Sequence, residues 1–142
     1  MYRKILVGID GSPGANAALR RAILLARDND DATLVAVAVE EHFPRFAATV
    51  GETDDARDER DAYFARVVGE ARKLAVTQNV PIICEVTRGN PAKVLVERGR
   101  ELECELIVIG HSSHAKAVWG NLLGSTADRV VDHAHCDVLI VR

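Results

Sequence analysis

The sequence predicts one α/β domain over residues 1–142: a single doubly wound, mainly parallel five-stranded sheet with helices on both faces. Two observations predict this fold. Short apolar runs rich in Val, Ile and Leu alternate with longer segments of helical periodicity, which is typical of parallel sheets with right-handed crossovers. In addition, no linker or internal repeat divides the 142 residues, and that length suits one domain.

The predicted strands are the five apolar runs, which span residues 4–9, 33–39, 80–86, 105–110 and 137–142. The segments "ILVGI" and "LIVI", in the first and fourth runs, are almost continuously apolar. Such runs indicate strands that are covered on both faces of the sheet. We therefore expect the first and fourth strands to be central neighbours.

Helical patterns fill the gaps between the strands. They span residues 13–28, 58–78, 91 to about 103, and 125–134. Ser12 precedes Pro13 and Asn90 precedes Pro91, so each pair predicts an N-cap followed by proline at the first helical position. Ser125 is the predicted cap of the last helix.

The acidic segment 40–60 interrupts this alternation of strands and helices, because it is long for a connection between a strand and a helix. We interpret it as a mobile surface loop or lid. An alternative is a partner-binding arm, since Phe43 and Phe46 stand where solvent could reach them.

Composition excludes several classes of function. The net charge of −3 gives no basic surface for nucleic acid, and no apolar stretch approaches the ~20 residues that span a membrane. The N-terminus enters a strand directly, without the core of a signal peptide. The scattered residues Cys84, Cys104 and Cys136 include no CxxC pair and are expected to be buried free thiols. These features favour a cytoplasmic protein.

A ligand site is expected at the carboxyl ends of the first and fourth strands, where a doubly wound sheet reverses its strand order. Gly8 would allow close approach of a ligand, and Asp10 would accept a hydrogen bond from an adenine amino group or a ribose hydroxyl. The alternative is that Asp10 and Ser12 only cap the first helix.

The second half of this site would be the start of the last helix. Free N–H groups at Ser125 and Thr126, together with the helix dipole, predict an anion site after Gly124. Neither G-x-x-x-x-G-K-[ST] nor G-x-G-x-x-G is present, so the loop from Gly110 to Gly124 is no standard phosphate fingerprint.

The motifs "KILVGIDGS", "GNPAKVLVE", "LIVIGHSS", "LLGSTADRVV" and "HAHCDVLIVR" resemble those of universal stress proteins of the UspA family over essentially the whole chain. The resemblance implies a Rossmann-like domain that forms dimers through its last strand and often binds ATP without rapid turnover. ATP-binding members carry G-x2-G-x9-G-[ST] after the fourth strand. Here Gly110 and Gly124-Ser125 match the outer positions, whereas the middle glycine is replaced by Ser113 or His114 in a loop one residue longer.

The resemblance also implies that Asp10 lies near the base and that the backbone of Ala38 and Val39 contacts the adenine. His111 and His114 are expected to touch phosphate or solvent, and protonation would strengthen a phosphate contact as pH falls. The full predicted binding set is Gly8, Ile9, Asp10, Ala38, Val39, Gly110, His111, Ser113, His114, Gly124, Ser125 and Thr126.

No metal site is expected beyond Mg²⁺ that accompanies the nucleotide. His111 and His114 form one group and residues 133–136 another, and the predicted topology puts the two groups at opposite ends of the sheet. No catalytic residue is predicted either, because the site lacks an activated nucleophile, paired carboxylates and a general base.

The sequence thus favours a non-enzymatic regulatory protein that binds ATP or AMP and acts in the stress response with an unidentified protein partner. Two alternatives stay open: a ligand-free interaction module whose phosphate loop has degenerated, and a slow ATPase. Strand 137–142 is apolar with nothing after it to cover its edge, which predicts a homodimer through this strand. Burial of that strand by a neighbouring helix is the alternative.

Overall fold

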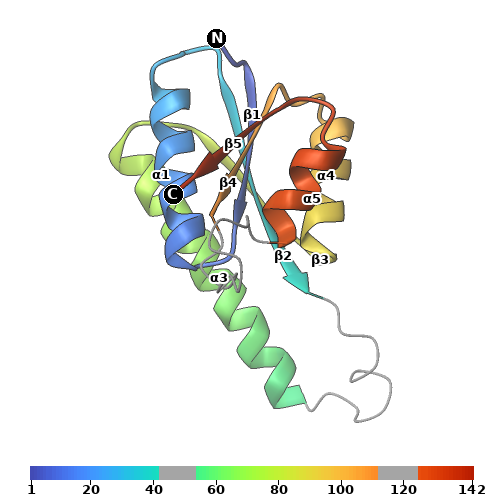
Figure 1. Cartoon of the computed structure of the whole chain (residues 1–142). Coiled ribbons are helices and arrows are strands. Elements are labelled where there is room, and N and C mark those ends of the chain that lie inside the picture. The colour runs from blue at the N-terminus through green and yellow to red at the C-terminus, as the bar shows by residue number, and fades with distance from the viewer. Residues whose placement is uncertain (42–53, 112–124) are drawn as a thin grey trace.

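A five-stranded parallel sheet forms the centre of the protein in a computed structural model that describes residues 1–41, 54–111 and 125–142 (Figure 1). The strands are β1 (Lys4–Ile9), β2 (Thr33–Glu41), β3 (Ile82–Gly89), β4 (Leu106–Gly110) and β5 (Asp137–Val141). Their order across the sheet is β3-β2-β1-β4-β5, and every neighbouring pair is parallel. The predicted doubly wound sheet is confirmed.

Two layers of helices cover this sheet. Their bounds are α1 (Pro13–Arg27), α3 (Asp54–Thr77), α4 (Pro91–Glu101) and α5 (Ser125–His133). Helices α1 and α3 pack on one face and α4 and α5 on the other, and each face has its own apolar core (Figure 1). Alternate residues of a central strand therefore enter different cores: Val7 packs with α1 and α3, and Leu6 with α4. Within the described ranges, no helix has the length and apolar character needed to cross a membrane.

The predicted starts of α1 and α4 are confirmed. The Ser12 hydroxyl accepts a hydrogen bond from the Ala15 N–H at 3.2 Å, and the Asn90 side-chain oxygen accepts one from the Lys93 N–H at 3.1 Å. A proline follows each cap, where its missing N–H costs no helical hydrogen bond. These local contacts fix where both helices leave the carboxyl edge of the sheet.

The interpretation of residues 40–60 as one irregular segment is wrong at both ends. Glu40 and Glu41 are the last residues of β2, and α3 begins at Asp54. Good helix formers in "DDARDER" extend α3 toward its N-terminus, and Arg60 donates to the buried Glu40 carboxylate at 2.9 Å. The two phenylalanines, Phe43 and Phe46, lie outside the described residues.

The three cysteines are free thiols, as predicted, but they differ in burial. Cys104 is fully buried, and this burial raises the pKa of its thiol to about 11. Cys84 and Cys136 are only half-buried. The expected full burial therefore holds for one of the three.

Candidate functional site

Strands β1 and β4 are neighbours at the centre of the sheet, as their apolar sequences predict. Ile5 pairs with Leu106 and Val7 with Val108. The chain leaves β1 through α1 on one face and leaves β4 toward α5 on the other, so the connections diverge between these strands (Figure 1). This is the switch point at which doubly wound sheets bind ligands.

Asp10, which follows β1, organises the turn into α1. Its Oδ1 accepts a hydrogen bond from the Ser12 N–H at 2.8 Å, and its backbone carbonyl accepts one from the Tyr63 hydroxyl of α3. The Asp10 side chain is exposed, and its Oδ2 accepts no hydrogen bond from the described residues. Asp10 therefore does stabilise the turn into α1, as the alternative interpretation proposed. Its second carboxylate oxygen stays exposed.

Gly8 gives this edge of the sheet its shape on the α4 side. A β-carbon on Gly8 would lie 3.1 Å from Leu95 Cδ1 and 3.9 Å from Ile109 Cγ2. A larger residue would therefore press on the Leu95 side chain and push α4 away from the end of β1. The glycine thus has a packing role against α4, and its predicted close approach to a ligand stays a prediction.

The other predicted contacts near the base have buried side chains. Ile9 and Ala38 are 3% and 0% exposed and belong to the core under α1 and α3, whereas Val39 lies in the core on the α4 side. A ligand could contact these residues only through their backbone atoms or, for Val39, through the small exposed part of its side chain. Contact of their backbone groups with a base stays a prediction.

Gly110 ends β4 against the first turn of α1. A β-carbon on Gly110 would lie 2.2 Å from the Gly14 carbonyl oxygen, and one on Gly14 would lie 2.7 Å from the His111 carbonyl oxygen. These contacts involve backbone atoms, which cannot swing aside as a side chain can. Gly110 therefore has a packing role that the sequence motif did not reveal.

The phosphate side of the predicted site is described only in part. His111 is half-buried, and its N–H donates to the Val141 carbonyl at 2.7 Å, which continues the β4–β5 ladder. Helix α5 begins at Ser125, and Thr126 is half-buried in its first turn. Three predicted residues, Ser113, His114 and Gly124, lie outside the described residues, as does the side chain of Ser125.

The described histidines lie at opposite ends of the sheet. His111 follows the carboxyl end of β4, whereas His133 ends α5 and His135 precedes the amino end of β5. In the described part of the chain, no three His, Cys, Asp or Glu side chains are grouped to hold a metal ion.

Tyr63 and Glu40 are two residues near this edge that the sequence analysis did not assign. Tyr63 lies in the helix predicted at residues 58–78; it is 40% exposed, and its hydroxyl joins α3 to the turn at Asp10. Glu40 binds Arg60 at 2.9 Å and Arg88 at 3.2 Å, which ties α3 to β2 and β3. A charged residue next to an apolar strand was the available signal for Glu40, but its partners are distant in sequence.

Comparison with known proteins agrees with this architecture. The whole chain, residues 1–142, matches the universal stress protein family. A universal stress protein of Methanocaldococcus jannaschii is 31% identical over 147 residues, covering 100% of this chain and 83% of the relative.

Solved structures extend the likeness to three dimensions. UspA from Lactobacillus plantarum is 28% identical with a TM-score of 0.77, over 99% of this chain and 98% of that one. A universal stress protein crystallised in complex with cAMP is 26% identical with a TM-score of 0.72, over 99% and 97% of the two chains. The protein described here belongs to the universal stress protein family.

Proposed function

We propose that this protein binds an adenine nucleotide, ATP or AMP, at the carboxyl ends of β1 and β4 and acts without catalysis as a dimeric regulator in the cytoplasmic stress response. The observation that carries the proposal is the adjacency of β1 and β4, which brings the Asp10 turn beside the end of the strand that leads to α5. The relative of 26% identity in complex with cAMP supports the choice of an adenine nucleotide.

The described residues fit the base end of such a ligand. The Oδ2 of Asp10, which accepts no hydrogen bond from the described residues, is an acceptor for an adenine amino group or a ribose hydroxyl. Ile9 ends β1 and pairs with Ala38 of the neighbouring strand β2, and Val39 follows Ala38 two residues before β2 ends. The base is therefore assigned to the β1–β2 side of the crevice.

The phosphates are assigned to the amino end of α5. Backbone N–H groups at Ser125 and Thr126 begin this nine-residue helix and have no helical acceptors, so they favour an anion. Ser113, His114 and Gly124 remain part of the proposed cradle, with Gly110 and His111 at its start. A magnesium ion would enter only with the nucleotide, as a ligand of its phosphates.

The absence of catalysis is proposed from the roles of the groups that follow β1. Asp10 and Ser12 both accept hydrogen bonds from backbone N–H groups of the turn and the first helical residues. Among the residues that the structure describes, neither is hydrogen-bonded to a second side chain that would activate it as a nucleophile or a base. The slow ATPase is the rival, and release of phosphate above a protein-free blank would favour it.

Homodimer formation is proposed through β5, which lies at the edge of the sheet. Val138, Leu139 and Ile140 are half-buried in the monomer, so each keeps apolar surface near that edge. A long apolar edge strand either aggregates or pairs, and pairing with a second copy satisfies its free backbone groups. The altered glycine spacing at Ser113 and His114 favours the second candidate function, a ligand-free dimeric interaction module.

A titration of the purified chain with fluorescent mant-ATP, competed by ATP, AMP and cAMP, tests nucleotide binding. The Asp10→Asn variant keeps an acceptor oxygen for the Ser12 N–H but loses the carboxylate charge. We expect it to bind about tenfold more weakly, the typical effect of losing a hydrogen bond to a charged group. Asp30→Asn, an exposed carboxylate in the α1–β2 turn, is the matched control. The absence of saturable binding to the unmodified chain would leave the ligand-free module as the function.

A further inference from the structure

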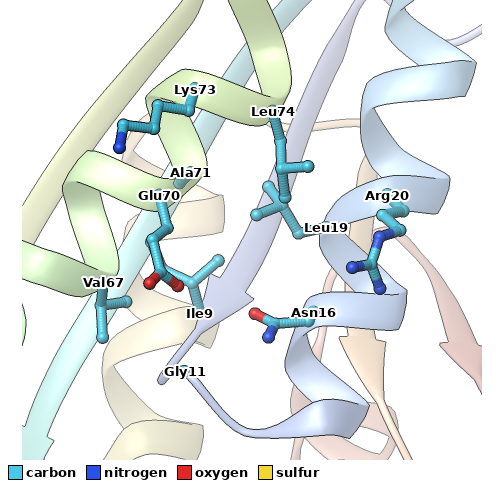
Figure 2. Close-up of a pocket in the computed structure, with 10 residues that line it drawn as sticks. All are labelled: Ile9, Gly11, Asn16, Leu19, Arg20, Val67, Glu70, Ala71, Lys73 and Leu74. Atoms are coloured by element: carbon cyan, nitrogen blue, oxygen red, sulfur yellow. The ribbon is translucent and has the colours of Figure 1, made fainter. Parts of the chain in front are cut away.

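A cavity lies between α1 and α3, on the face of the sheet opposite α4 and α5. Its volume is about 260 Å³ (Figure 2). Apolar side chains from β1 and both helices line it: Ile9, Leu19, Val67, Ala71 and Leu74. Because ligand pockets for drug-sized molecules measure roughly 300–1,000 Å³, this cavity suits a smaller molecule with a short apolar body.

Charged groups of opposite sign stand on the two helices that border the cavity. Arg20 of α1 and Glu70 of α3 both line it and are exposed at its mouth. Within residues 1–41, 54–111 and 125–142, neither side chain makes an ion pair, and the two are not paired with each other. Both charges are therefore available to a ligand in the cavity.

The polar side chains differ in direction. Figure 2 shows the Glu70 carboxylate and the Asn16 amide extending toward the space between the helices, with the Arg20 guanidinium on the α1 side. The Lys73 ammonium points away from these groups, so its stem rather than its charge borders the cavity (Figure 2). The mouth thus presents one cation, one anion and one amide.

We propose that this cavity binds a free α-amino acid with an aliphatic side chain. Such a zwitterion would place its carboxylate at Arg20 and its ammonium at Glu70, with the Asn16 amide available to either group. Its side chain would lie against Leu19, Leu74 and the other apolar lining residues. A simple fatty acid would leave Glu70 without a partner and close to a second carboxylate, and an amine would do the same to Arg20.

The cavity and the proposed nucleotide site share only Ile9, whose side chain lines the cavity while its backbone is assigned to the nucleotide. Ile9 and Gly11 line the cavity, whereas Gly8 faces Leu95 of α4 on the other side of β1. The short turn between β1 and α1 therefore borders both sites. The inference goes beyond the proposed function, and it stands whether or not a nucleotide binds.

Three ligands with the same branched aliphatic body separate the charge requirements: leucine, 4-methylpentanoate, which lacks the ammonium, and 3-methylbutylamine, which lacks the carboxylate. Each is titrated into the nucleotide-free, ¹⁵N-labelled chain and followed by amide chemical shifts. We expect leucine to give saturable shifts at Gly11, Leu19 and Ala71. The other two should bind about tenfold more weakly, since each loses one hydrogen-bonded charge.

Arg20→Gln and Glu70→Gln should each weaken leucine binding about tenfold. Arg20→Gln should leave the weak binding of 3-methylbutylamine, which lacks the carboxylate, unchanged, and Glu70→Gln should do the same for 4-methylpentanoate, which lacks the ammonium. Arg21→Gln and Glu59→Gln, exposed positions on the same helices that do not line the cavity, are the matched controls. The proposal is overturned if leucine gives no saturable shifts, if 4-methylpentanoate binds as tightly as leucine, or if the controls weaken binding as much as the cavity variants. Nucleotide binding is measured separately with mant-ATP, so failure of one proposal is distinguishable from failure of the other.

Discussion

Gly110 and Gly14 meet backbone to backbone: a β-carbon on Gly110 would lie 2.2 Å from the Gly14 carbonyl oxygen and 2.3 Å from its carbonyl carbon. The contact joins the end of β4 to the first turn of α1, two segments about a hundred residues apart in sequence. The glycine that opens the phosphate-loop motif therefore also sets how closely α1 seats on the sheet.

Gly110→Ala should lower the free energy of unfolding by about 3 kcal/mol, because the added methyl group forces the helix and the strand apart. Urea unfolding checks this value. Gly69→Ala is the matched control, since a β-carbon there meets nothing within 4 Å in the middle of α3. That control should gain about 0.5–1 kcal/mol, and equal destabilisation by both substitutions would contradict the packing role of Gly110.

Glu40→Gln should loosen the N-terminal half of α3. The substitution removes the charge that binds Arg60 and Arg88, whose side chains are 32% and 56% exposed, while the Glu40 side chain is 8% exposed. Because both arginines stay partly solvated, we expect a loss of about 1–2 kcal/mol, less than for a fully buried pair. Hydrogen exchange at the amides of residues 57–63 should quicken. Glu41→Gln, the exposed neighbour in β2, should leave exchange unchanged.

Glu85→Gln should change how stability depends on pH. Arg98 donates two hydrogen bonds to the Glu85 carboxylate, at 2.7 and 2.9 Å, and these bonds lower the pKa of Glu85 below its ordinary value. A lowered pKa stabilises the fold above the ordinary glutamate pKa of about 4.3, and this contribution is lost as pH falls through the lowered value.

The variant should therefore be less stable than the parent by about 0.5–1 kcal/mol at neutral pH, with the difference vanishing at an acidic pH below the lowered pKa of Glu85. Urea unfolding at the two pH values measures it. Glu97→Gln, whose carboxylate lies 4.0 Å from Lys93 on an exposed face of α4, should change little at either pH. A difference that stays constant with pH would show that the effect does not arise from the Glu85 charge.

Ile140→Pro tests the dimer without disturbing the sheet. The Val141 carbonyl accepts from His111 of the neighbouring strand end, so Val141 faces β4 and the backbone N–H of Ile140 points to the free edge. Proline removes this outward N–H and is tolerated on edge strands. We expect a folded monomer by size-exclusion chromatography with light scattering. Leu139→Pro removes an inward N–H and should destabilise the monomer itself, and a dimeric Ile140→Pro protein would contradict pairing through β5.

The local elements could be predicted from the sequence because their signals are local. The predicted strand at residues 4–9 coincides with β1, and the caps at Ser12 and Asn90 act within three residues of themselves. The uniform apolarity of β1 and β4 even predicted that they are central neighbours. A strand lacks polar side chains on both of its faces only when helices cover both faces of the sheet there. Family membership followed from motifs that span the whole chain.

Other features depend on contacts between segments far apart in the chain, which no local pattern encodes. Residues 54–57 fall outside the helix predicted at 58–78 because the anchor of this first turn, the bond from Arg60 to Glu40, becomes evident only once α3 lies beside β2. The candidate site shows the same division. Asp10 was identified from sequence, but the hydrogen bond from Tyr63 and the contact of Gly110 with Gly14 were not.

The sequence by itself determined the order of strands and helices, the starts of α1 and α4, and the family, because hydrophobic period and capping act over a few residues. The tertiary structure alone decided which face of the sheet each side chain enters, why Gly110 must be glycine, and that Arg20 and Glu70 stand across one cavity. The physical reason is that crossover connections bring together residues whose separation in sequence carries no signal of their distance in space.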